Sequence, residues 1–198
     1  MKWFLDPWAA VAGAFLLMVM PLKWLGACVT AAAFHEACHL LAAKLTGGEV
    51  EGLTIGLSGA RISARFPDQK GELLTALAGP VGSLLLLVLL SVAPRLALCG
   101  GVQGVYNLLP LYPKDGGRVL KCLLEMVLPQ QSERLCRWAE ITALLMLAAL
   151  AVLGSFCLKI GIWPVVMVGV RCLRWFCQKN SLQIVGNQGT IGLPITKR

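Results

Sequence analysis

The hydrophobic residues of this chain fall into long apolar runs that are separated by short polar breaks. Several runs approach or exceed the roughly 20 residues that an α-helix needs to cross the hydrocarbon core of a bilayer. The pattern predicts an all-α polytopic membrane protein with about six transmembrane helices, at residues 3–20, 24–45, 73–93, from 96 into the segment 106–120, 138–158 and 160–176. We expect one transmembrane domain over residues 1–178, with its chemical motifs within 24–120, and a short polar tail over 179–198.

The interval between the second and third runs, residues 46–70, is polar and has a different pattern. Its segment LTIGLSGARISARF alternates loosely between apolar and polar residues and breaks at Ser58 and Gly59. Alternation around a central turn signal predicts a short β-hairpin between the second and third helices. Further along, the mixed segment 114–137 predicts a short amphipathic helix around residues 117–128.

The composition agrees with a membrane protein, because 57% of the residues are hydrophobic and 14% are charged. Soluble domains have about 45–50% apolar residues and about a quarter charged residues. No A-x-A-like cleavage site separates the first run from the second, so no removable signal peptide is expected. The eight cysteines form no C-x-x-C pair and lie mostly in apolar runs. They are interpreted as reduced thiols that act as small hydrophobic residues.

The net charge of +8 is explained by membrane topology. With both termini in the cytoplasm, fifteen of the 18 Lys and Arg residues lie on the cytoplasmic side or its flanks, and Lys23, Arg95 and Lys159 lie on the other. This is the bias expected of cytoplasmic loops. No basic cluster is interleaved with aromatic residues, so nucleic acid is not expected as a partner. The same topology brings His39 and Asp115 to the cytoplasmic end of the bundle.

The second run contains FHEACH, which holds both histidines of the chain, His35 and His39, together with Glu36. On a helix, residues i and i+4 are about 40° apart around the axis and about 6 Å apart along it, so both imidazoles can reach one metal ion. Glu36 is close enough to hold a water molecule without being a ligand. Ionisable residues inside a membrane span are costly and indicate function. The spacing therefore predicts a zinc site with a carboxylate general base.

A catalytic zinc ion generally takes three protein ligands, and the third must be Asp, Glu or Cys because the chain has two histidines. Asp115 is the best placed, since it lies at matching depth in a segment that Pro and Gly residues break. Such backbone is tolerated at membrane depth only inside protein or beside a water-filled cavity. Cys38, three residues after His35, is an alternative near the same helix face, although a packing role is favoured for it.

The segments FHEACH and NLLPLYPKDGG resemble the two signatures of the site-2 protease family of intramembrane zinc metalloproteases. The resemblance implies one Zn²⁺ per chain, held by His35, His39 and Asp115. It also implies that Glu36 is the general base and that Asn107 is a catalytic polar group near the substrate carbonyl.

The segment AGPVGS resembles the Gly-Pro motif of the same family at Gly79 and Pro80, where small residues permit close helix approach. Ser83 and Lys114 stand where the family more often has Asn and Leu. The layout is most similar to the stage IV sporulation protease branch, which releases a membrane-tethered pro-sigma factor. The tail is too short for the nucleotide-binding (CBS) domain of that branch, so control by ATP is not expected.

The resemblance implies a function for the whole site. The chain would hydrolyse a peptide bond of a single-pass or membrane-tethered protein near its cytoplasmic boundary, in a cell membrane of the bacterial type. The predicted hairpin offers Leu53, Ile55 and Leu57 as substrate-binding residues, if an extended peptide adds to it as a strand; a plain surface loop is an equal alternative.

Two other functions compete with the protease. One is a non-proteolytic membrane protein of the same fold that binds and regulates a partner, and the other is a metal carrier. A carrier is expected to have ionisable residues across several spans, forming a path. An inert relative would typically lack Glu36 or Asp115, and both are present. The sequence favours the protease and leaves the oligomeric state open.

Overall fold

The computed structural model describes residues 2–5, 16–56, 59–157, 165–166, 168–170 and 172–173. The chain divides into two compact units, Met1–Glu140 and Ile141–Arg198. The first unit contains the candidate site. Of the second unit, the structure describes chiefly the C-terminal part of one helix.

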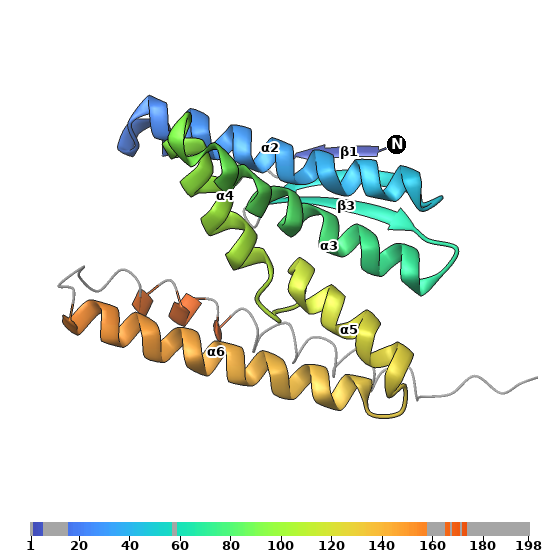
Figure 1. Ribbon diagram of the computed structural model, residues 1–198. Helices are drawn as coiled ribbons and strands as arrows, with labels where there is room; N and C mark the ends of the chain where they lie inside the picture. Colours follow the sequence, from blue (N-terminus) through green and yellow to red (C-terminus); the bar gives the residue numbers. More distant parts are fainter. Residues whose placement is uncertain are drawn as a thin grey trace, which may run out of the picture. The chain divides into compact units, whose positions relative to one another are not determined.

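Helices make up most of the described chain (Figure 1). They are α2 (Leu22–Leu45), α3 (Gln69–Leu85), α4 (Pro94–Asn107), α5 (Asp115–Val127) and α6 (Ser132–Cys157), and the 3₁₀ turn η1 (Leu86–Ser91) extends α3. Local signals place their starts. Asp68 caps α3 by accepting a hydrogen bond from the N–H of Gly71 at 2.8 Å. Pro94 occupies the first turn of α4, where its missing N–H has no cost.

Within the described part of the chain, three segments are long and apolar enough to cross a membrane: Leu22–Leu45, Gln69–Ser91 and Ser132–Cys157. They correspond to the second, third and fifth predicted spans. The fourth predicted span contains α4, which has 14 residues and is shorter than a typical membrane-spanning helix. Most of the sixth predicted span, and the tail over 179–198, lie outside the described residues.

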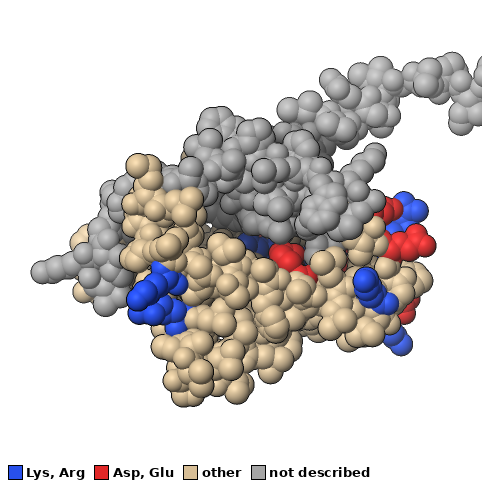
Figure 2. Space-filling model, turned by 90° about the horizontal axis from the view of Figure 1, so that it is seen from above, with Lys and Arg blue, Asp and Glu red and all other residues tan. Residues whose placement is uncertain are grey.

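The surface of these helices is that of a membrane protein. Large apolar side chains stand exposed on all three candidate spans, including Val29, Leu41, Val88 and Leu145. Figure 2 shows a face on which most of the described surface is uncharged and the charged residues gather mainly toward its two sides. Exposed apolar surface on this scale needs a lipid environment.

Small residues bring α2 and α3 together. The buried residues of α2 are spaced four apart along one face: Ala31, His35, His39 and Ala43. On α3, a side chain at Gly82 would overlap the Sγ atom of Cys38. Helices in membranes pack closely where such small residues meet. The contact therefore turns both histidines toward α3 and away from lipid, and it gives Cys38 a packing role.

A three-stranded sheet accompanies the helices, with the order β1 (Lys2–Leu5), β2 (Glu49–Gly56), β3 (Gly59–Arg65). β2 and β3 are antiparallel and lie in the interval predicted to form a hairpin, with an irregularity between Val50 and Gly52. β1 pairs with β2 in parallel. The prediction that a membrane helix begins at Trp3 is therefore wrong, because an apolar run alone does not separate a strand from a helix. Residues 6–15 lie outside the described residues.

The central position of β2 bears on the predicted substrate-binding residues. Leu53 pairs with Trp3 on one side and Ile62 on the other, and Ile55 pairs with Leu5 and Ala60. Both neighbours of β2 are thus in place, so the edges left for strand addition belong to β1 and β3. Leu57 lies outside the described residues.

Two cysteine thiols, one on α2 and one on α4, are in contact, which the sequence did not indicate. The Sγ atoms of Cys28 and Cys99 lie 3.0 Å apart as free thiols. We expect mild oxidation with copper phenanthroline to join them within one chain, because the two sulfur atoms are already in contact. Mass spectrometry after alkylation would detect the loss of two hydrogens. Cys38→Ser should leave the cross-link intact and Cys28→Ser should abolish it; full alkylation of both thiols after oxidation would contradict this packing of α2 against α4.

Candidate metal centre

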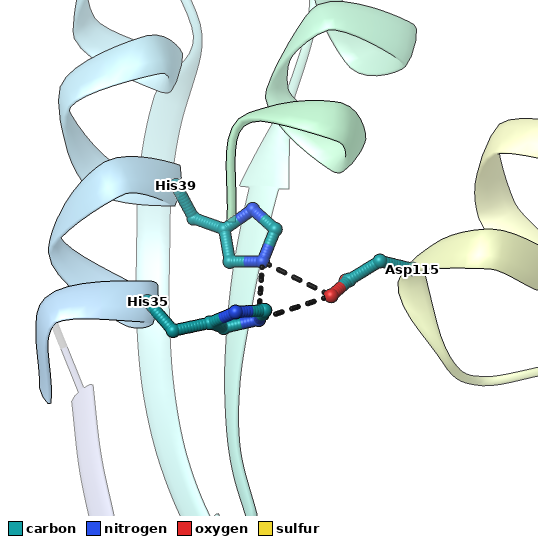
Figure 3. Close-up of side chains that lie close together, drawn as sticks. All are labelled: His35, His39 and Asp115. Carbon is teal, nitrogen blue, oxygen red and sulfur yellow. Dashed lines mark hydrogen bonds and ion pairs between the residues drawn. The ribbon is translucent and has the colours of Figure 1, made fainter. Parts of the chain in front are cut away.

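Three side chains from two distant segments converge on one point (Figure 3). His35 and His39 extend from α2, and Asp115 extends from the N-terminus of α5. The Nε2 atoms of the two histidines lie 3.1 Å apart, and Asp115 Oδ2 lies 3.1 Å from that of His35 and 3.2 Å from that of His39. The histidines are buried and the aspartate side chain is 14% exposed. Among the described residues, these three form a group that could hold a metal ion.

The spacing and protonation of this triangle fit a metal ion. His39 Nδ1 lies 2.7 Å from the carbonyl oxygen of Thr75 and must donate to it, which leaves the lone pair of Nε2 directed inward. His35 Nδ1 lies 2.8 Å from Ser83 Oγ, which can accept in the same way. Two lone pairs and a carboxylate oxygen then face one point. In a tetrahedral zinc site, ligand atoms about 2.0–2.1 Å from the ion are about 3.3 Å from one another, close to the observed edges.

The contacts with Thr75 and Ser83 were missed by sequence reasoning about the site. Ser83 is fully buried and Thr75 is 4% exposed, and both lie on α3. Partners that bind the second ring nitrogen of a ligating histidine fix its tautomer and orientation. Ser83 appeared in the sequence as a departure from the usual Asn, which was the available signal. The carbonyl of Thr75 gave none, because any residue has a carbonyl group.

Glycines position two of the three candidate ligands. A Cβ atom at Gly79 would overlap the imidazole of His39, so the ring can lie over α3 only because this residue has no side chain. A Cβ at Gly116 would overlap the carbonyl of Leu108, and one at Gly117 would lie 2.7 Å from the N atom of Tyr112. The two glycines therefore let the start of α5 lie against residues 108–112. This contact holds Asp115 opposite α2.

The remaining predicted site residues surround the triangle. Glu36 is half-buried on α2, and its carboxylate interacts electrostatically with His35, His39 and Asp115. Asn107, the last residue of α4, is 9% exposed, and its Nδ2 lies 3.3 Å from His35 Nε2. The structure thus brings together the residues of both sequence signatures. Cys38 is not part of the group.

The charge of Asp115 is favoured by its surroundings. Before a metal ion binds, a proton on either imidazole would let its Nε2 atom donate to Asp115 Oδ2, which favours the ionised carboxylate. Asp115 also lies in the first turn of α5, where the helix dipole favours a negative charge. A carboxylate is therefore ready to meet a cation at neutral pH.

A buried triangle of two histidines and an aspartate, set among apolar helices, is typical of a membrane protein with a candidate three-ligand metal site. Comparisons with known proteins agree. A family profile described as "Peptidase M50B-like" matches residues 8–99. The zinc metalloprotease MJ0392 of Methanocaldococcus jannaschii is 30% identical over 105 residues, which cover 46% of this chain and 31% of that relative. Rip3 of Mycobacterium tuberculosis is 31% identical over 109 residues, covering 46% of this chain and 28% of that protein.

A solved structure shares the fold. The site-2 protease from Methanocaldococcus jannaschii matches with a TM-score of 0.54 at 20% identity, over 96% of this chain and 89% of that one. The sequence matches span less than a third of the length of the curated relatives. Residues 8–99 thus resemble the M50B-like peptidases in sequence, and the chain shares the fold of a site-2 protease.

Proposed function

We propose that the chain is an intramembrane zinc metalloprotease that cleaves a single-pass or membrane-tethered protein. The observation that carries the proposal is the triangle of His35, His39 and Asp115 with Glu36 beside it. A carrier or an inert partner-binding protein needs no carboxylate base next to its metal ligands. The match of residues 8–99 to the M50B-like family profile and the name zinc metalloprotease of the M. jannaschii relative support the same function.

Each residue around the site has a role in the proposed reaction. A zinc ion, when bound, lowers the pKa of a water molecule and polarises the carbonyl of the peptide bond. A carboxylate oxygen of Glu36 accepts a proton from the attacking water and delivers it to the nitrogen of the leaving amine. Asn107 Nδ2 donates a hydrogen bond to the carbonyl oxygen as negative charge develops there. The Ser83 hydroxyl and the Thr75 carbonyl keep the two imidazoles in place.

The proposed topology has both termini and the catalytic residues on the cytoplasmic side. It is supported by the distribution of Lys and Arg along the chain. Reporter fusions after residue 198 and within 46–70 should both report cytoplasm, and an extracytoplasmic signal from either would contradict it. A membrane-tethered pro-sigma factor is one substrate of the proposed kind.

The function can be tested without knowing the natural substrate. Zinc-loaded protein in liposomes is mixed with a set of synthetic single-span peptides of about 25 residues, and the products are identified by mass spectrometry. We expect cleavage toward one end of the apolar segment, loss of cleavage with 1,10-phenanthroline, and recovery when zinc is restored. A folded, zinc-loaded protein that leaves every peptide intact would contradict the proposal.

Gly79 provides a sharper prediction about the site. Gly79→Ala should lower the affinity for Zn²⁺ by about 10–100-fold, because the new methyl group overlaps the His39 ring. Gly26→Ala is the matched control, since a Cβ there meets nothing within 4 Å. Alanine has a higher helix propensity than glycine, so neither change weakens its helix, and a difference in zinc affinity between the two variants must have another cause. Competition with a chromophoric chelator measures the affinities; equal affinities would mean that the ring can move without loss of the ligand.

A further inference from the structure

Lys114 lies beside the candidate metal centre and directs its side chain toward the end of α4. It immediately precedes Asp115 and is half-buried. Its Nζ atom donates a hydrogen bond to Asn107 Oδ1 at 3.0 Å. The same ammonium group lies 4.1 Å from the ring centroid of Tyr106, a distance typical of a cation–π contact. The last two residues of α4 therefore hold the Lys114 ammonium between them.

This contact decides which way the Asn107 amide faces. Its oxygen accepts from Lys114, and its Nδ2 group lies on the other side, 3.3 Å from His35 Nε2. Turned over, the amide would set its NH₂ group against an ammonium and its oxygen against a nitrogen lone pair. Both contacts would be repulsive. A hydrogen bond from a charged donor favours the observed orientation by about tenfold or more.

We propose that Lys114 is a positioning residue that holds the NH₂ group of Asn107 toward the point where His35, His39 and Asp115 converge. The inference rests on the proposed function, in which this group donates to the carbonyl oxygen of the substrate. Lys114 itself bonds to the far end of the amide. It acts on the reaction through Asn107.

The contact is tested first in metal-free protein, where the result does not depend on the proposed function. The variants are Lys114→Met, Asn107→Ala and the pair together, with Lys121→Met as control because Lys121 lies on α5 and pairs with Glu125. Lys114→Met and Asn107→Ala should each lower the melting temperature in detergent by about 2–4 °C relative to the Lys121→Met control. Both variants remove the Lys114–Asn107 hydrogen bond, while Lys114→Met also removes the contact with Tyr106 and Asn107→Ala the contact with His35, so the shift of the double variant should be smaller than the sum of the two single shifts. Shifts that add would overturn the proposal.

The positioning role is tested with Co²⁺ as the metal and acetohydroxamate as the probe, whose carbonyl oxygen stands in for that of a substrate. Lys114→Met should hold Co²⁺ within about twofold of wild type while binding acetohydroxamate about tenfold more weakly. Lys114→Arg keeps the charge and the stacking on Tyr106 and should restore binding to within about threefold. Asn107→Ala should lower the affinity for acetohydroxamate, and adding Lys114→Met should lower that affinity no further.

Other outcomes separate the two proposals. If Lys114→Met lowers the affinity for Co²⁺ as much as the affinity for acetohydroxamate, Lys114 acts on the metal ligands directly, and the positioning role is overturned. Failure of folded wild-type protein to hold Co²⁺ or Zn²⁺ would overturn the proposed function, and the positioning role with it, even where the melting experiment shows that Lys114 and Asn107 are coupled.

Discussion

Asp115→Ala should bind Zn²⁺ more than about 100-fold more weakly than the wild-type chain, which we expect to hold one zinc ion. In the proposed site, Asp115 supplies one of three ligand atoms and the only negative charge among them. Loss of a partner that only orients a ligand already costs about 10–100-fold, and loss of the ligand itself should cost more. Metal analysis of detergent-purified protein gives the number of zinc ions per chain, and competition with a chelator gives the affinity for Zn²⁺.

The experiment needs controls for folding and for charge. Glu125→Ala removes a carboxylate from the same helix, α5, where Glu125 pairs with Lys121, and it should keep its zinc. Asp115→Asn keeps an oxygen at nearly the same place without the charge and should lie between wild type and Asp115→Ala. Full zinc content in folded Asp115→Ala would show that the two sequence signatures do not form one site.

The two histidines could be predicted because their relation is local. A helix fixes the geometry of residues four apart, so FHEACH by itself indicates that His35 and His39 share a face. The structure places these two residues on the buried face of α2. Asp115 required a longer argument, in which charge distribution set the topology and topology set the depth of each motif. The carboxylate does lie against both imidazoles.

The residues that hold the ligands could not be read from sequence because they act through tertiary contacts. The methyl group that Gly79 lacks matters only because His39 lies over it. The orientation of Asn107 depends on Lys114, seven residues away and beyond a break between two helices. Such contacts depend on how helices turn and pack, which the apolar pattern of each helix does not determine.

The N-terminal strand shows a different limit. Residues 3–20 are apolar enough to suggest one continuous helix, yet Lys2–Leu5 joins β2 in parallel. A parallel pair joins segments far apart in sequence, so no turn signal announces it. The pairing also changes the hypothesis about substrate binding, because β1 occupies the edge of β2 to which an extended substrate could otherwise add as a strand.

Glu36→Gln should keep zinc within about twofold of wild type and lose at least about 10³-fold in the rate of peptide cleavage. Gln has nearly the same shape but cannot accept a proton at neutral pH, and Glu36 lies beside the metal ligands without being one of them. Glu133→Gln is the matched control, since Glu133 is exposed in the first turn of α6 and should leave both numbers unchanged. Parallel measurement of zinc content and of peptide products separates the roles. Loss of zinc would make Glu36 a ligand, whereas retained cleavage would require another base, and either result would remove the proposed path of the proton from water to the leaving amine.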